Sequence, residues 1–180
     1  MTKIIKAGDL KITTGKMQRI DQAIALIGNP ALLDISLLAV FGSTSCPARY
    51  LLQAHELAHE WRHGKTGIIS GFHAPAEKEV LAVLLKGTCP IIVVLGRSLE
   101  NARILAAWKE EIESGRMLVI SPFKKYQKYV TKEISMKRND LAARIAGRVM
   151  IIHASEGGSL QGQVGKWKSE GIQVEYLDKI

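Results

Sequence analysis

The chain has 180 residues, of which 47% are hydrophobic and 23% charged, a composition that excludes intrinsic disorder and is typical of a globular protein with a buried core. Its net charge of +8 favours an anionic partner such as a nucleic acid or a nucleotide. No apolar run approaches the roughly 18 residues of a membrane span, and the N-terminus lacks the apolar segment of a signal peptide, so we expect a cytoplasmic protein with no membrane partner.

We expect a single domain over residues 1–180, in which residues 1–25 form an N-terminal extension or a hairpin. A helix running into a strand is our expectation for residues 17–29. The two cysteines, Cys46 and Cys89, are too few for a disulfide framework, and we interpret them as reduced thiols.

From residue 36 onward, short apolar runs alternate with amphipathic segments of helical length, separated by Gly, Ser or Pro. Continuously apolar strands that alternate with helices predict a doubly wound, Rossmann-like α/β fold, in which a mainly parallel sheet has helices on both faces. The predicted strands are 36–43, 66–71, 89–96, 116–122, 148–154 and 172–177. The predicted helices are 47–64, 75–87, 100–115, 139–147 and 159–171.

The first predicted helix contains the sequence His-Glu-Leu-Ala-His at residues 55–59, which matches the signature of zinc proteases. Histidines at i and i+4 share one helix face, and the glutamate of such a motif acts as a general base. The metzincin continuation is missing, because Trp61 and Lys65 stand where Gly and His are required. A gluzincin would need a third ligand from further along the chain, for which Glu77 or Glu79 is available.

The position of this helix argues against a zinc enzyme. It connects the first two core strands, so its apolar side is expected to pack on the sheet and its histidines to face solvent or the helix flank. We therefore interpret the motif as a chance match and expect no bound metal, with a zinc hydrolase as the third hypothesis. The residues expected to pack on the sheet are Leu51, Leu52, Leu57 and Ala58.

Open α/β sheets bind ligands beyond the carboxyl ends of their strands. Small and hydroxyl residues dominate these ends in this chain, as backbone N–H groups and helix N-termini that approach a phosphate require. The alternative is that the same residues only form turns and helix caps. We favour a binding crevice without a cofactor. The candidate residues at these ends are Gly42, Ser43, Ser70, Gly71, Arg97, Gly158 and Ser159.

Residues 123–138 interleave basic and aromatic side chains. Lysines neutralise phosphates, and aromatic rings stack on unpaired bases, so this segment is a candidate surface for single-stranded nucleic acid. The alternative is a solvated loop or helix whose tyrosines pack at the edge of the domain. The candidate residues are Lys124, Lys125 and Lys128, and the segment extends to Arg138.

Motifs in the same order along residues 26–177 resemble the Rossmann-like core of the DNA-processing protein A family (DprA/Smf). The family's Gly-Asn-x-x-Leu-Leu and Val-Gly-Ser-Arg motifs are similar to GNPALL at residues 28–33 and AVFGST at 39–44. Its Ser-Gly-Gly-Ala and Val-Leu-Gly strand ends are similar to SGFHAPAE and VLGRSL, and the later motifs to GRMLVISPF, KRNDLAARIAG and VMIIHASEGGSL.

The resemblance implies binding of single-stranded DNA and assistance to a RecA-type recombinase during DNA uptake or recombination, without catalysis. It also implies roles in the pocket for Arg138 and Asn139, beside the strand-end residues named above. A homodimer is left open.

The chain departs from the family pattern at the strand ends. Thr44 replaces the arginine after Gly-Ser, Glu77 stands in place of Asp, and Phe72 to Pro75 replace a glycine-rich run. A bulky Phe72 and a rigid Pro75 are expected to narrow or reshape a phosphate-sized pocket. The chain also has no room for the flanking domains of full-length members, which suggests a diverged, stand-alone core.

The alternative function is that of a Rossmann-like protein that binds a nucleotide-derived small molecule, similar to the nucleoside-monophosphate phosphoribohydrolases of the LOG type. In SEGGSLQGQ only Gly157 and Gly158 match the motif of those enzymes, and Gln163 lies near the expected acid. Ligand binding without hydrolysis is therefore the form of this alternative that we consider.

Overall fold

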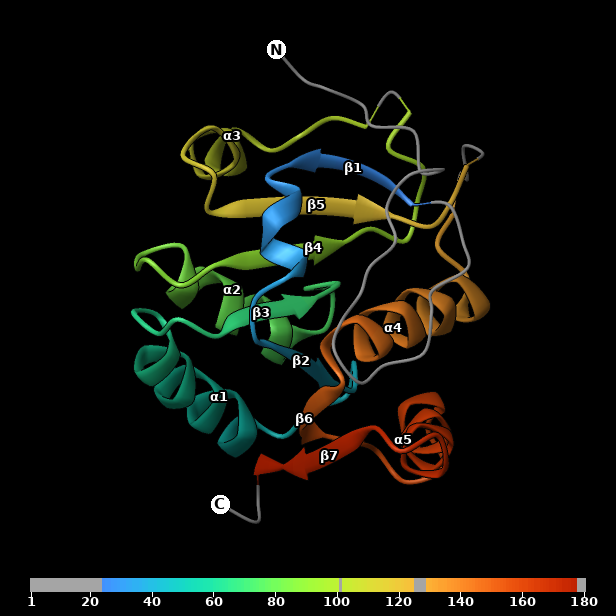
Figure 1. The fold of residues 1–180 in the computed structure, drawn as a ribbon. Helices are drawn as coiled ribbons and strands as arrows, with labels where there is room; N and C mark the ends of the chain where they lie inside the picture. The colour runs from blue at the N-terminus through green and yellow to red at the C-terminus, as the bar shows by residue number, and fades with distance from the viewer. Residues whose placement is uncertain (1–23, 101, 125–128, 178–180) are drawn as a thin grey trace.

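The computed structural model describes residues 24–100, 102–124 and 129–177 (Figure 1). In these ranges the chain forms a seven-stranded sheet with the order β1-β5-β4-β3-β2-β6-β7. The strands are β1 (Ala25–Gly28), β2 (Leu37–Gly42), β3 (Gly67–Ser70), β4 (Ile91–Val94), β5 (Met117–Ser121), β6 (Arg148–His153) and β7 (Gln173–Tyr176). The helices are α1 (Ala48–Trp61), α2 (Pro75–Leu84), α3 (Ala106–Glu113), α4 (Lys132–Ala146) and α5 (Ser159–Ser169), with a 3-10 helix η1 (Pro30–Leu33).

The sheet is mainly parallel. Only the edge strand β1 runs antiparallel, against β5, while β2 to β7 pair in parallel with their neighbours. The chain moves outward from β2 through β3 and β4 to β5, and then returns to place β6 on the other side of β2. The strand order therefore reverses between β2 and β6, at the point where sheets of this type form a ligand crevice. The predicted doubly wound α/β fold is confirmed.

Successive residues of the central strands enter two different hydrophobic layers. On β2, Ala39 and Phe41 pack beneath α4 and α5, where Trp167 is fully buried against the Phe41 ring. Leu38 and Val40 face the opposite layer, which α1 and α2 cover. Because both faces of each strand are buried, the strands are continuously apolar rather than alternating. Figure 1 shows the helices on both sides of the sheet.

Two helix boundaries differ from the prediction. Helix α4 begins at Lys132, seven residues before the predicted start at residue 139, because the Thr131 hydroxyl accepts the backbone N–H of Ile134 at 3.3 Å and caps the helix. The last seven residues of the basic segment, 132–138, are therefore helical. Helix α3 begins at Ala106 rather than at residue 100, because the Ser98 hydroxyl accepts the N–H of Glu100 at 3.0 Å and holds a turn there.

The residues that attach α1 to the sheet also differ from the prediction. Tyr50, Ala54 and Ala58 are buried, whereas Leu52 is 60% exposed, so the prediction that Leu52 packs on the sheet was wrong. The buried residues follow the four-residue spacing of one helix face, and Leu52 lies off that face. Leu51 and Leu57 are partly buried at its margins.

The N-terminal part of the prediction is tested only in part. For residues 17–29 we predicted a helix followed by a strand, and a strand does form at Ala25–Gly28. The predicted hairpin and the helical half fall within residues 1–23, which lie outside the described residues. Among the described residues, no helix combines the length and apolar content that a membrane crossing requires.

Gly28 generates a test of the β1 and β5 pairing. Its φ is +114°, and an added Cβ would clash with the carbonyl oxygen of Met117 on β5. We expect Gly28→Ala to lower the free energy of unfolding by about 2 kcal/mol or more, because backbone strain and steric overlap both oppose it. Urea denaturation measures the change. Gly162→Ala is the control, because Gly162 lies in α5 with open space around it and should be neutral or slightly stabilised; an equal loss in both variants would contradict the pairing.

Candidate anion site at the carboxyl edge of the sheet

A buried carboxylate ties together the carboxyl ends of β2 and β3. Glu77, in the first turn of α2, is only 2% exposed. Its Oε1 accepts the backbone N–H of Gly42 at 3.2 Å, and its Oε2 accepts the N–H groups of His73 at 2.9 Å and Ala74 at 3.4 Å. Because these amides belong to the end of β2 and to the loop after β3, Glu77 fixes the shape of both.

Burial raises the pKa of the Glu77 carboxyl, while the charge of Arg138 and the three backbone N–H donors act in the opposite direction. Its role was not found from the sequence, where Glu77 was considered only as a metal ligand and as a replacement for an aspartate. The available signal was its position three residues after Ala74 at the start of a helix, where a glutamate commonly bonds back to the N-terminal backbone.

Arg138 of α4 lies beside this edge and is 4% exposed. Its side chain packs directly on Gly71, where an added Cβ would overlap the guanidinium. Two of its nitrogens, Nε and Nη2, donate to Oδ1 of Asn139 at 3.2 and 3.0 Å. The third, Nη1, is buried and has no hydrogen-bond partner among the described residues. A buried unsatisfied donor of a charged group costs more than about 1–3 kcal/mol, which an anion bound at this nitrogen would recover.

A polar network between α4 and α5 holds Asn139 in place. Its Nδ2 donates to Oε1 of Gln163 at 3.4 Å, and Nε2 of Gln163 donates to the Met136 carbonyl at 2.8 Å and to Asp140 at 2.9 Å. Asp140 also accepts from the Trp167 indole at 2.8 Å. Arg138 therefore has little freedom to move away from Gly71, because its side-chain partner among the described residues, Asn139, is itself anchored to a second helix.

Positive charge is concentrated around the same edge. His73 lies within the electrostatic reach of Arg138, Lys78 and Arg97. Partial burial and these three cations lower the pKa of His73 to about 4, although its ring still reaches solvent. Lys78 and Arg97 are exposed, as is Lys124 after β5. The edge thus combines one buried guanidinium with several solvent-facing cations, an arrangement that attracts anions.

The second part of the edge lies at the reversal of strand order between β2 and β6. The Ser43 hydroxyl accepts the backbone N–H of Ser155 at 2.9 Å, and the Ser43 N–H donates to the His153 carbonyl at 2.8 Å. Gly158 is the N-cap of α5 and Ser159 its first residue. The predicted strand-end residues therefore do lie at one edge. Ser43 and Gly42 are committed to internal hydrogen bonds rather than to open N–H groups.

Phe72 does not occupy the place expected of it. Its φ is +52°, the left-handed region, and its side chain is 5% exposed within the hydrophobic cluster under α1 and α2. The Ser70 hydroxyl accepts its N–H at 3.2 Å. The ring thus contributes to the core while the backbone takes a conformation that a glycine adopts more easily. Pro75 is simply the first residue of α2.

The predicted basic segment is described in part. Lys124 is exposed, and Tyr129 is 70% exposed just before the cap of α4. Next to it, the Val130 side chain lies close to Gly96 at the end of β4. This contact places Tyr129 near the cationic edge. Lys125 and Lys128 lie outside the described residues.

The zinc-protease motif lies on α1, between β2 and β3, as expected. Of the two glutamates considered as a third zinc ligand, Glu79 contacts His55 on α1. Glu77 instead accepts hydrogen bonds from backbone amides at the strand ends. Among the described residues, no group of three or more His, Cys, Asp or Glu side chains could hold a metal ion.

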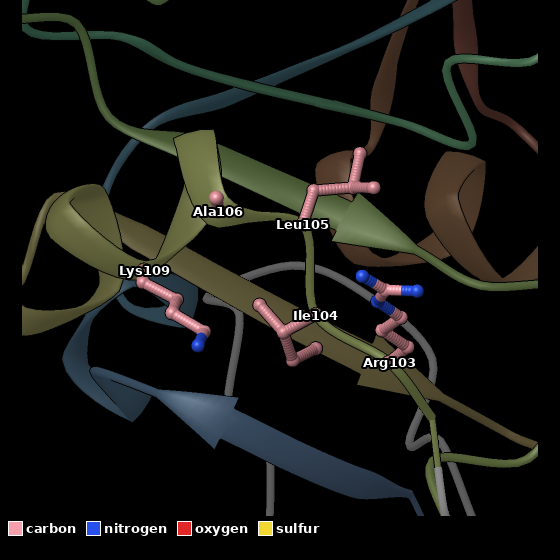
Figure 2. Close-up of a pocket in the computed structure, with 5 residues that line it drawn as sticks. All are labelled: Arg103, Ile104, Leu105, Ala106 and Lys109. Atoms are coloured by element: carbon pink, nitrogen blue, oxygen red, sulfur yellow. The ribbon is translucent and has the colours of Figure 1, made fainter.

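A depression of about 440 Å³ lies at the start of α3, where the chain passes over β5 and β1 (Figure 2). It includes none of the predicted site residues. Its lining is mostly apolar, with one cation at each end and no carboxylate, so it differs in character from the edge described above. The lining residues are Arg103, Ile104, Leu105, Ala106 and Lys109.

A doubly wound sheet with cations gathered at its carboxyl edge defines a Rossmann-like protein suited to an anionic ligand. The model of the family described as DNA recombination-mediator protein A matches residues 12–164, and the chain therefore belongs to this family. No curated protein matches the chain.

Solved structures of two DNA processing proteins share the fold. The protein from Streptococcus pneumoniae has a TM-score of 0.70 and 20% identity, over 86% of this chain and 54% of that chain. The chain thus spans about half the length of that protein. The protein from Helicobacter pylori, whose structure concerns its single-stranded DNA binding mode, has a TM-score of 0.72 and 17% identity, over 98% of this chain and 79% of that chain.

His73 generates a pH prediction. Its folded pKa of about 4 lies below the ordinary value of 6.5, so the unfolded chain binds its proton first as the pH falls. The stability contributed by neutral His73 is complete above pH 6.5 and is lost progressively down to about pH 4. We expect His73→Gln to flatten the fall in urea-denaturation stability across that interval. Identical curves for His73→Gln and wild type would contradict the assignment.

Proposed function

We propose that this protein binds single-stranded DNA along the carboxyl edge of its sheet, with one phosphate at Arg138 and neighbouring phosphates at the exposed cations. The observation that carries the proposal is the buried Arg138 guanidinium, whose Nη1 finds no hydrogen-bond partner in the described part of the chain and whose other nitrogens are fixed by Asn139. Planar guanidinium groups held in this way suit phosphate oxygens. Membership of the DNA recombination-mediator family supports the choice of DNA as the anion.

Glu77 limits where the phosphate can bind. Its oxygens occupy the N–H groups of Gly42, His73 and Ala74, which would otherwise be available to an anion. We therefore place the phosphate on the Arg138 side of the edge, toward Arg97 and Lys78. In this proposal the small strand-end residues shape the edge through their backbone and their size. They are Gly42, Ser43, Ser70, Gly71, Gly158 and Ser159.

A single strand fits this edge better than a duplex because an aromatic ring accompanies the cations. Tyr129 is 70% exposed beside the end of β4, and stacking of a base on such a ring is worth about 1–3 kcal/mol. Bases are available for stacking only when they are unpaired. Lys124 would extend the charged path along the strand, whereas Lys125 and Lys128 lie outside the described residues.

Assistance to a RecA-type recombinase during DNA uptake or recombination, in the cytoplasm, is the part of the proposal that rests on the family alone. We propose binding without catalysis. The carboxylate of Glu77, buried at the edge, is engaged by backbone amides, and the amide of Gln163, near the position of the phosphoribohydrolase acid, serves to anchor Asn139. Neither group is placed to transfer a proton.

A second candidate is a nucleotide-derived small molecule bound at the same edge. The confined position of Arg138, between Gly71 and α5-anchored Asn139, favours a single phosphate as readily as a polymer. The two candidates differ in their dependence on salt, because a strand that contacts several cations releases several counterions.

Removal of the exposed edge cations tests the DNA proposal. We expect the triple variant Lys78→Ala, Arg97→Ala, Lys124→Ala to bind labelled single-stranded DNA more weakly and to reduce the slope of log affinity against log salt by about 2, since each phosphate contact on a single strand contributes about 0.7. Fluorescence anisotropy across a salt series measures both quantities.

The matched control removes three exposed charges from the opposite edge, with Lys65→Ala, Lys86→Ala, Lys168→Ala. It should retain most of the affinity and of the slope. Equal losses in the two triple variants would show diffuse attraction to the +8 charge rather than a site. Affinity for a mononucleotide without affinity for the strand would favour the second candidate.

Arg138 is tested by Arg138→Lys, which keeps the charge and loses the planar donor group. We expect single-strand affinity to fall about tenfold or more, because hydrogen bonds between charged partners are worth about 1.5–3 kcal/mol. Circular dichroism and urea denaturation establish that the variant is folded. A folded Arg138→Lys protein with wild-type affinity would show that Arg138 makes no specific contact.

A further inference from the structure

Two imidazoles on α1 approach each other closely at a point away from the strand ends. Nε2 of His55 lies 3.1 Å from Nε2 of His59, one turn further along the helix. Nδ1 of His55 lies 2.6 Å from Oε1 of Glu79 on α2, which packs against α1. The His55 and Glu79 side chains are 40% and 44% exposed, so solvent ions reach them.

The hydrogen bonds fix which nitrogens can bind a cation. In neutral His55 the proton lies on Nδ1, because an ionised carboxylate only accepts, and Nε2 has a lone pair. His59 Nε2–H then donates to it in the metal-free protein. If His59 moves its proton to Nδ1, both Nε2 lone pairs become available at the same place, with no net release of protons.

The separation of these nitrogens suits a transition metal. Zinc binds imidazole nitrogens at about 2.0–2.1 Å, so two ligands at a tetrahedral angle lie about 3.3 Å apart and two at a right angle about 2.9 Å apart. The observed 3.1 Å falls between these values. Glu79 supplies the carboxylate that orients a metal-binding histidine from its other nitrogen, as in many zinc sites.

We propose that His55 and His59 form a two-imidazole site for a borderline divalent metal such as Zn²⁺, Ni²⁺ or Cu²⁺, with Glu79 as the positioning residue. Water completes the coordination, because the described residues provide no third ligand of the His, Cys, Asp or Glu type. The site goes beyond DNA binding and is independent of it. It also reverses the expectation from sequence that the chain holds no metal, without restoring a protease.

Isothermal titration of the full chain, free of any affinity tag and treated with chelator, tests the site with NiCl₂, ZnCl₂ and CuCl₂ as separate titrants. We expect one ion per chain, with Cu²⁺ bound most tightly. His59→Ala should abolish the stoichiometric isotherm, and Glu79→Gln should weaken it by about 10- to 100-fold. Far-UV circular dichroism verifies that these exposed substitutions leave the fold intact.

His63→Ala is the matched control, since His63 comes four residues after His59 but its Nδ1 lies 3.4 Å from the Thr88 hydroxyl instead of near the pair. It should bind metal as wild type does. The proposal is overturned if no titrant binds, if His59→Ala binds as wild type, or if His63→Ala loses binding to the same extent. Loss of binding in Cys46→Ser would likewise overturn it, because a half-exposed thiol would then be the ligand.

Discussion

The structure of the carboxyl edge of the sheet depends on two buried charged groups, Glu77 and Arg138, that form hydrogen bonds to different partners rather than to each other. Glu77 and Arg138 are both almost fully buried and close enough to influence each other, yet the carboxylate bonds to backbone amides and the guanidinium to Asn139. A direct pair between them would have left neither group for a ligand. Because Glu77 is satisfied by the chain itself, Arg138 keeps one nitrogen without a hydrogen-bond partner among the described residues, and the shape of the loops around it is fixed in advance.

This arrangement explains how the chain departs from its family pattern and keeps the architecture of the edge. The arginine that follows Gly-Ser in the family is Thr44 here, and the glycine-rich run contains Phe72. Phe72 takes a left-handed backbone conformation and places its ring in the core, so the loop retains a glycine-like path. The positive charge of the edge comes from Arg138, Arg97 and Lys78, because Thr44 supplies none in the place of the family's arginine.

Most of the fold could be predicted from the sequence, because strands buried on both faces must be continuously apolar and their alternation with helices restricts the topology. Boundaries failed where local chemistry competes with the pattern. The Thr131 cap lies inside a run of charged residues that carries little apolar periodicity. Leu52 is apolar and was predicted to pack on the sheet, but the orientation of the helix leaves it exposed.

The site could be predicted only as a location. Gly42, Ser70 and Gly71 were found because strand ends of parallel sheets meet at one edge, which requires no knowledge of side-chain contacts. The spacing of Glu77 from Ala74 indicates a bond to the N-terminus of its own helix, but no spacing in the sequence encodes its bond to Gly42 or the contact of Gln163 with Asn139. Arg138 was reached from the sequence as the end of the basic segment and through the family resemblance, but nothing in a basic helix marks one buried guanidinium among its neighbours.

The central claim is that a DNA phosphate binds at Arg138 on the carboxyl edge. The most direct measurement is an NMR titration of ¹⁵N-labelled protein with a short oligothymidylate, which follows the Arg138 Nε–H signal and the backbone amides. The account predicts that this signal and the amides of Gly71, Arg97 and Ser98 shift together and saturate at one affinity. Shifts confined to the depression around Ile104 and Lys109, with the Arg138 signal unmoved, would contradict it.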